Sequence, residues 1–189
     1  MSKKIIVFLA DGFEEIEALS PVDYLRRAGA EVFTVSITDD EFVRGSHNII
    51  VKTDLRLDSY LEKNDLPDAI IIPGGMPGST NLANCTKLLN LVEKAFDKEK
   101  LICAICAAPA VVLGKTKLLK DKDWTCYSGM ENHAESYLSS FNSEARLVKS
   151  GNLITAKGPG VAEEFSMEIV KTLFDDSLKE KIKAASIQR

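Results

Sequence analysis

The sequence predicts an α/β protein whose central, mostly parallel sheet is covered by helices on both faces. Three short apolar runs, at residues 4–10, 69–72 and 101–105, are typical of strands buried on both sides of a parallel sheet. Each run is followed by a turn of small or glycine residues and then by a helical pattern. This repeated order of strand, turn and helix predicts the fold class.

Length and composition favour one compact unit. The chain has 189 residues, of which 45% are hydrophobic, so residues 1–189 fit a single domain with its own core. The net charge of −4 argues against nucleic acid as the main partner. No apolar run reaches the length of a membrane span, and the first residues lack a signal peptide's apolar segment. We therefore expect a cytoplasmic protein without a membrane partner.

The first half of the chain begins with the strand at residues 4–10. A helix follows the acidic turn and continues to about Ala28, where Gly29 is its stop. Pro21 lies inside this helix, so we expect the helix to start late or to bend there. Residues 31–36 alternate in polarity and predict a second strand. Residues 42–43 and 49–51 predict two more strands or a hairpin.

The second half repeats the pattern three times. The strand at residues 69–72 leads through a glycine-rich turn at 73–78 into a helix expected over 81–98. The strand at 101–105 leads through the turn at Cys106 into the next helix. The strand at 153–156 leads through residues 157–160 into a helix at 161–174. Residues 177–187 predict a last amphipathic helix.

Cys106 is the most informative residue of the chain. It ends a buried apolar run and is followed by Ala107, Ala108 and Pro109, which favour a sharp turn into a helix. This is the nucleophile elbow with sulfur in place of a serine oxygen. Because unpaired N–H groups at a helix start stabilise negative charge, we expect a thiolate with a lowered pKa. The sequence thus predicts one reactive cysteine.

Parallel topology places the candidate site. Sites of open α/β sheets form at the carboxyl ends of the strands, so the turns at 11–17, 73–78, 106–109 and 157–160 should meet at one edge. Gly74 and Gly75 allow close approach of the main chain to a ligand. Their N–H groups and that of Ala107 could form an oxyanion hole for a carbonyl attacked by Cys106. A nucleotide-binding fingerprint is absent from the sequence.

The chemical partner of the thiol is expected to be a carboxylate. His47 and His133 lie in polar stretches and are interpreted as solvated residues, although His133 and Glu135 have the spacing of cysteine amidotransferases. Glu14 and Glu17 share one helix face at the mouth of the first strand, and spacing does not choose between them. A carboxyl group desolvated beside a thiolate would have a raised pKa and could carry protons.

The remaining cysteines are expected to have lesser roles. Cys103 lies within a predicted strand, three residues before Cys106, and is interpreted as a buried packing residue. No Cys/His cluster has metal-ligand spacing, so no metal is expected.

Several motifs together resemble the ThiJ/PfpI family of the class I glutamine-amidotransferase-like fold, in particular its deglycase branch. They are residues 10–17 (ADGFEEIE), 21–23 (PVD), 25–29 (LRRAG), 73–75 (PGG), 104–109 (AICAAP) and 158–160 (GPG) with Glu164 and Phe165. The resemblance covers nearly the whole chain. It implies a flavodoxin-like three-layer sandwich, a homodimer and no cofactor.

The resemblance also implies roles for individual residues. Cys106 matches the family's nucleophile and Glu17 its carboxyl partner. The oxyanion and substrate-binding positions implied or expected here are Gly74, Gly75, Ala107, Glu14, Cys126, Pro159 and, approaching the partner subunit's site, Arg27. The implied function is that of a glyoxalase or deglycase, which converts methylglyoxal-type aldehydes and early glycation adducts to hydroxy acids such as lactate. The alternative is an oxidative-stress sensor or chaperone whose Cys106 is oxidised to a sulfinate.

Two departures from the family pattern matter. The protease-like branch has a histidine after the nucleophile, where this chain has Ala107, and this argues against peptidase activity. The deglycase branch has a pocket histidine where this chain is expected to have Cys126. We therefore expect a second thiol near the first, one that could pair with an oxidised Cys106.

Overall fold

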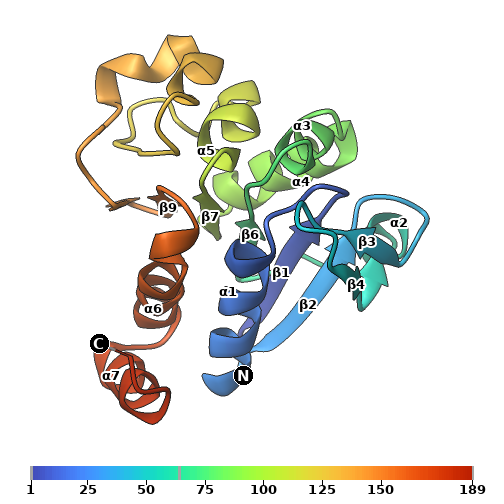
Figure 1. Ribbon diagram of the computed structural model, residues 1–189, viewed down its shortest axis with the longest axis vertical. Helices are drawn as coiled ribbons and strands as arrows, with labels where there is room; N and C mark the ends of the chain where they lie inside the picture. Colours follow the sequence, from blue (N-terminus) through green and yellow to red (C-terminus); the bar gives the residue numbers. More distant parts are fainter. Residues whose placement is uncertain (1, 64, 189) are drawn as a thin grey trace.

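The computed structural model describes residues 2–63 and 65–188. Within them, seven strands form a sheet in the order β5-β2-β1-β6-β7-β9-β8, in which β8 alone is antiparallel to its neighbour (Figure 1). The strands of the sheet are β1 (Lys4–Leu9), β2 (Glu31–Ser36), β5 (Leu55–Arg56), β6 (Ala69–Ile72), β7 (Leu101–Ile105), β8 (Leu147–Ser150) and β9 (Leu153–Ala156). A separate antiparallel hairpin contains β3 (Phe42–Arg44) and β4 (Ile50–Lys52). The predicted fold class is confirmed.

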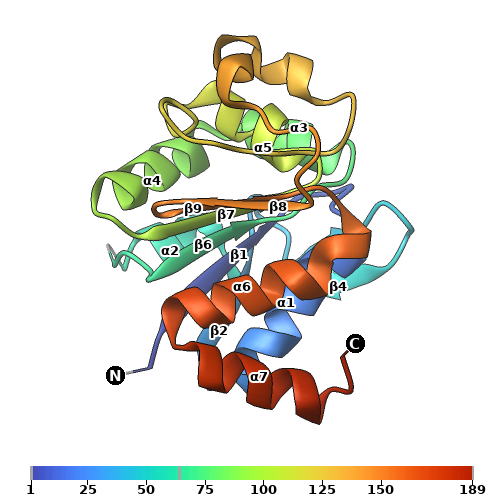
Figure 2. The same ribbon diagram turned by 90° about the vertical axis from the view of Figure 1, so that its left-hand side faces the viewer.

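Helices cover both faces of the sheet and make a three-layer sandwich, which Figure 2 shows edge-on. One face carries α1 (Glu15–Arg27), α6 (Ala162–Leu173) and α7 (Asp176–Ala185). The other face carries α2 (Leu57–Leu61), α3 (Gly78–Ala83), α4 (Thr86–Asp97) and α5 (Ala108–Val111). Short 3-10 segments are η1 (Leu113–Lys115), η2 (Glu131–Ser140) and η3 (Pro159–Val161).

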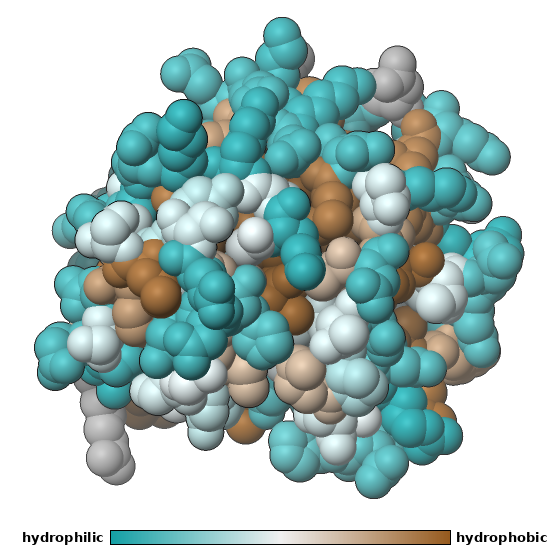
Figure 3. All heavy atoms as spheres, turned by 90° about the horizontal axis from the view of Figure 1, so that it is seen from above, coloured by the Kyte–Doolittle hydropathy of each residue, from teal (hydrophilic) through white to brown (hydrophobic). Residues whose placement is uncertain are grey.

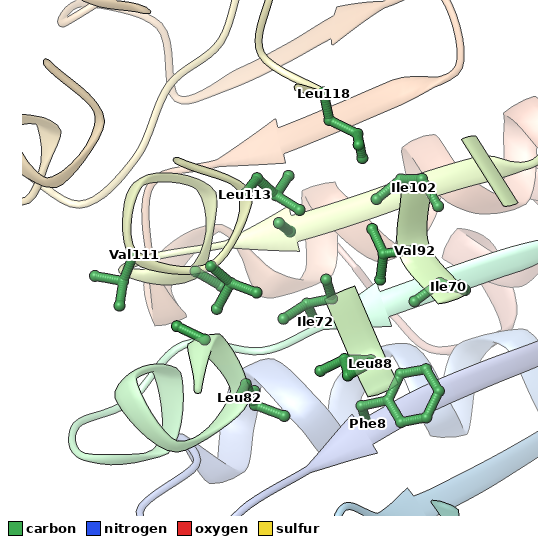
Figure 4. Packing of buried hydrophobic residues seen from close by; sticks show 14 of the residues in the cluster. Phe8, Ile70, Ile72, Leu82, Leu88, Val92, Ile102, Val111, Leu113 and Leu118 are labelled. Atoms are coloured by element: carbon green, nitrogen blue, oxygen red, sulfur yellow. The ribbon is translucent and has the colours of Figure 1, made fainter. Parts of the chain in front are cut away.

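The alternation of side chains along each strand divides the core into two clusters. Ile70 and Ile72 of β6 face α3 and α4, where Figure 4 shows them with Leu82 and Leu88. Ile71, between them in sequence, belongs to the cluster under α1 and α6. All three isoleucines of β6 are fully buried, as expected for a strand covered on both faces.

The structure corrects one helix prediction and decides where another helix begins. The helix expected over residues 81–98 is divided into α3 and α4, because Cys85 adopts extended backbone angles (φ −87°, ψ 91°). Asn84 and Cys85 are both weak helix formers, which makes this a natural place to break. Helix α1 does not start late: it begins at Glu15 and contains Pro21, and Glu14 caps its first turn by accepting a 2.8 Å hydrogen bond from the Glu17 N–H group.

The outer surface has the polar character expected from the composition. Among the described residues, no helix is both long and apolar enough to cross a membrane. Seen from above the view of Figure 1, the surface is mostly polar, with apolar side chains exposed in small separate groups (Figure 3).

Candidate active site

Cys106 lies on a strained turn immediately after β7. Its φ angle of 65° is in the left-handed region, which a residue with a side chain rarely adopts. Two hydrogen bonds hold it there: its N–H group donates to the Ala156 carbonyl, and its carbonyl accepts from the Tyr127 N–H group, both at 2.8 Å. Strain that neighbouring strands hold in place is frequent at functional sites. The sharp turn predicted from the sequence is therefore present, with a partly exposed thiol.

Glu17 reaches the same point from the first turn of α1. Its side chain is fully buried, and its Oε2 atom accepts a 2.8 Å hydrogen bond from the Gly74 N–H group. Its other oxygen, Oε1, is buried and has no hydrogen-bond partner among the described residues. Glu14 is instead used as the helix cap. The structure thus places Glu17, and not Glu14, against Cys106.

The glycines after β6 allow this close packing. A side chain at Gly74 would begin 2.6 Å from the Cys106 Cβ atom and 2.6 Å from the Glu17 Oε2 atom. Gly75 has a φ of 88° and leaves no room for a Cβ atom beside the Gly12 carbonyl. The Gly74 N–H group is committed to Glu17, so it is not an oxyanion donor, contrary to our expectation.

The pKa of the Cys106 thiol differs from the one that the sequence predicts. We expected a lowered thiol pKa, but burial, followed by the charge of Glu17, raises the pKa of Cys106 to about 12. The N–H groups of Ala107 and Gly75 act in the opposite direction and are outweighed. Because α5 has only four residues, its dipole is weak. Burial also raises the pKa of Glu17 to about 7, so near neutrality the thiol keeps its proton and Glu17 exists in both its protonated and its charged form.

This pKa has a measurable effect on stability. Because Glu17 has a pKa of about 7 in the folded state against 4.5 for an ordinary glutamate, its proton stabilises the fold fully below pH 4.5. That contribution is lost as the pH rises through 7. We expect wild type to lose about 3 kcal/mol of unfolding free energy, relative to Glu17→Gln, from below pH 4.5 to above pH 7. Urea denaturation measures it, and a pH-independent difference between the two proteins would contradict it.

Cys126, which we expected beside the first thiol, is buried. Its side chain is fully buried in the core cluster under α3 and α4, and its sulfur faces the Tyr127 carbonyl at 3.4 Å. Trp124 and Cys126 both belong to this core, whereas the next residue, Tyr127, is exposed. Tyr127 is therefore the residue that reaches the site: its ring lies against Gly158, beside Glu17.

The other predicted residues lie farther from the thiol. Arg27, on the last turn of α1, is exposed and pairs with Asp23 at 2.7 Å, so in a single chain it does not reach Cys106. Pro159 is exposed at the start of η3, and the adjacent Gly158 is the residue that lines the site. Cys103 is fully buried in β7, as predicted.

The histidines lie outside the Cys106 site. His133 lies in η2, and His47 contacts Glu15 through a 2.8 Å interaction with its Nδ1 atom. Glu14, Glu15 and His47 form a group whose potential ligand atoms lie within 4.8 Å of one another. Protein groups already satisfy both Glu15 oxygens, since they accept hydrogen bonds from Ser46 and His47. We assign no metal to this group.

Fold and site together define a class: flavodoxin-like α/β proteins with a cysteine on a strained strand-to-helix turn and a buried carboxyl group beside it. The sequence model of the DJ-1/PfpI family matches residues 3–172, and the chain belongs to this family.

Individual relatives agree with this assignment. Protein DJ-1 homolog A of Arabidopsis thaliana is 33% identical over all of this chain, which spans only 47% of that relative's length. A putative cysteine protease of Bacillus subtilis, YraA, is 34% identical over 92% of this chain and 99% of its own length. The solved structure of oxidized Toxoplasma gondii DJ-1 has a TM-score of 0.92 and 35% identity, covering 98% of each chain.

Proposed function

We propose that this protein is a cysteine-dependent, cofactor-independent enzyme that converts methylglyoxal-type 2-oxoaldehydes to hydroxy acids, and that it also acts on early glycation adducts. One observation carries the proposal: a partly exposed thiol on a strained turn faces a buried carboxyl group that has one free oxygen. A proton carrier and a nucleophile in contact are what an internal proton transfer on a bound aldehyde requires.

The first step is addition. The Cys106 sulfur attacks the aldehyde carbon of methylglyoxal, and the C=O π electrons move to oxygen, giving a hemithioacetal. The N–H groups of Gly75 and Ala107 lie close to the sulfur and are placed to stabilise that oxygen. The proton that leaves the Cys106 thiol, which the Glu17 carboxylate can carry, neutralises it.

The next steps move a hydrogen within the substrate. Glu17 removes the proton from the former aldehyde carbon, giving an enediol, and returns a proton to the neighbouring carbon. The product is a lactate thioester on Cys106. Water then cleaves the carbon–sulfur bond, releasing lactate and regenerating the thiol. The sum is methylglyoxal plus water giving lactate, so no external oxidant or reductant is needed.

Peptidase activity is not part of this proposal, although one relative is named as a putative cysteine protease. Ala107 follows the nucleophile, and both histidines of the chain lie outside the site. A carboxyl group with a pKa of about 7 suits proton transfer on an activated aldehyde.

A second candidate function rests on the same free oxygen of Glu17. A Cys106 sulfinate could accept a hydrogen bond from protonated Glu17, which favours arrest of oxidation at that stage. Mild peroxide treatment followed by mass spectrometry tests this role: a gain of two oxygen atoms confined to Cys106 is expected. A disulfide between Cys106 and Cys126 would contradict it, and the burial of Cys126 disfavours such a bond.

We also propose that two copies of the chain form a homodimer. Four apolar side chains, Ile16, Phe42, Ile49 and Ile50, are each more than half exposed. They lie on α1 and on the β3–β4 hairpin, which are joined where the His47 N–H group donates to the Glu15 Oε1 atom at 2.7 Å. Exposed apolar groups on adjoining elements favour association. Light scattering measures the mass in solution.

The experiment that tests the proposed activity is lactate formation from methylglyoxal without glutathione. Omitting glutathione removes the route in which a free thiol forms the hemithioacetal. Reduced wild-type protein is expected to produce lactate. If folded, reduced wild-type protein produces none, methylglyoxal is not its substrate.

A further inference from the structure

Tyr127 is an exposed aromatic residue beside the nucleophile that the proposed mechanism leaves unused. Half of its side chain is exposed, and its hydroxyl group has no hydrogen-bond partner among the described residues. The position of the ring is therefore not set by a hydrogen bond of its hydroxyl group.

The main chain holds Tyr127 next to the thiol. Its N–H group donates to the Cys106 carbonyl at 2.8 Å, and its own carbonyl accepts from Met130 at 3.0 Å, which closes a turn. The ring is therefore attached to a backbone position fixed directly against the nucleophile. Its neighbour Cys126 is anchored in the core.

Gly158 shows how narrow the space beside the ring is. A methyl group at Gly158 would lie 3.3 Å from the Tyr127 Cδ2 atom and 4.0 Å from the Glu17 Oε1 atom. One methyl group at this position would therefore contact both the aromatic ring and the free oxygen of Glu17. A substrate carbon that exchanges a proton with Glu17 must fit beside this ring.

We propose that the Tyr127 ring, with Gly158 opposite it, is a size-selective wall of the Cys106 site. It admits short, unbranched 2-oxoaldehydes and excludes those with bulky substituents. The substrate part of this inference rests on the proposed function. The part that concerns access, namely which molecules can reach the Cys106 sulfur, does not depend on the proposed function.

Access can be measured without turnover, by alkylation of Cys106 with a small reagent, iodoacetamide, and a bulky one, N-phenylmaleimide. A Cys85→Ser background leaves Cys106 as the partly exposed thiol, because Cys103 and Cys126 are fully buried. In this background, Tyr127→Ala is expected to raise the ratio of the alkylation rate with the bulky reagent to that with the small reagent by at least about tenfold. Shaped pockets discriminate between substrates on this scale. Tyr127→Phe keeps the ring and should behave as the parent.

Two further variants sharpen the test. Tyr24→Ala removes a tyrosine of α1 that bonds Glu163, away from the thiol, and should change neither rate. Gly158→Ala places a methyl group in the gap and should slow both reagents. The proposal is wrong if Tyr127→Ala leaves the ratio of the two rates unchanged, or if Tyr127→Phe opens the site as alanine does.

Turnover separates this inference from the proposed function. With methylglyoxal and phenylglyoxal as substrates, Tyr127→Ala should raise the ratio of kcat/KM for phenylglyoxal to kcat/KM for methylglyoxal. If alkylation shows the selectivity and neither aldehyde is converted, the proposed activity fails while the selective wall stands. If both aldehydes are converted with an unchanged preference, the wall is refuted and the activity stands.

Discussion

Replacing Glu17 by glutamine is expected to slow lactate formation from methylglyoxal by about 10²- to 10⁴-fold, the usual contribution of a positioned acid–base group. Glutamine retains the shape and an oxygen that can accept the Gly74 N–H group, so the turn should stay folded. It cannot exchange a proton with the substrate. The rate should therefore fall while the free energy of unfolding at neutral pH is retained or increased. Lactate assays and urea denaturation of the same preparation measure both.

Glu15→Gln is the matched control for this experiment. Glu15 lies on the same helix and is almost as buried, but its carboxylate accepts hydrogen bonds from His47 and Ser46. Its replacement should leave the catalytic rate nearly unchanged. Equal losses in the two variants would mean that a general disturbance of α1, and not proton transfer by Glu17, explains the effect.

Replacing Gly74 by alanine is expected to damage both the fold and the activity. The added methyl group would lie 2.6 Å from the Cys106 Cβ atom, 2.6 Å from the Glu17 Oε2 atom and 3.0 Å from the Ile105 carbonyl. Each distance is shorter than a van der Waals contact, so the thiol and carboxyl group must move apart. Overpacking of this kind costs about 1–3 kcal/mol, and misplacement by about 1 Å costs roughly 100-fold in rate.

Gly160→Ala is the matched control for Gly74→Ala. Gly160 is exposed, and a methyl group there meets no atom within 4 Å in the described structure. Its substitution should change neither the urea midpoint nor lactate formation. The account is contradicted if Gly74→Ala is as stable and as active as Gly160→Ala.

The strands of the sheet centre could be predicted closely because burial on both faces leaves a clear pattern. β6, β7 and β9 begin and end at the residues expected from their apolar runs. The edge strands were not predicted. β5 has two residues, and β8 is a partly exposed LVKS segment with one face turned to solvent, so neither forms an apolar run.

The site could be predicted in outline because parallel topology brings strand ends together. It could not be predicted in detail. Choosing between Glu14 and Glu17 depended on which carboxylate caps α1, and spacing along a helix does not reveal that. The thiol pKa was misjudged because the sequence shows a helix start but not the burial or the facing charge. Tyr127 was missed because Cys126 was matched to a family position, and the sequence does not show which of these two neighbours is buried.

The most direct test of the central claim compares wild type with Cys106→Ser in the lactate assay without glutathione. The serine variant keeps the side-chain size and the strained turn but is a far poorer nucleophile near neutral pH. We expect wild type to produce lactate and the variant to lose activity by roughly 10³-fold or more, since a covalent step has lost its nucleophile. Lactate formed at similar rates by both proteins would contradict the claim that Cys106 is the nucleophile.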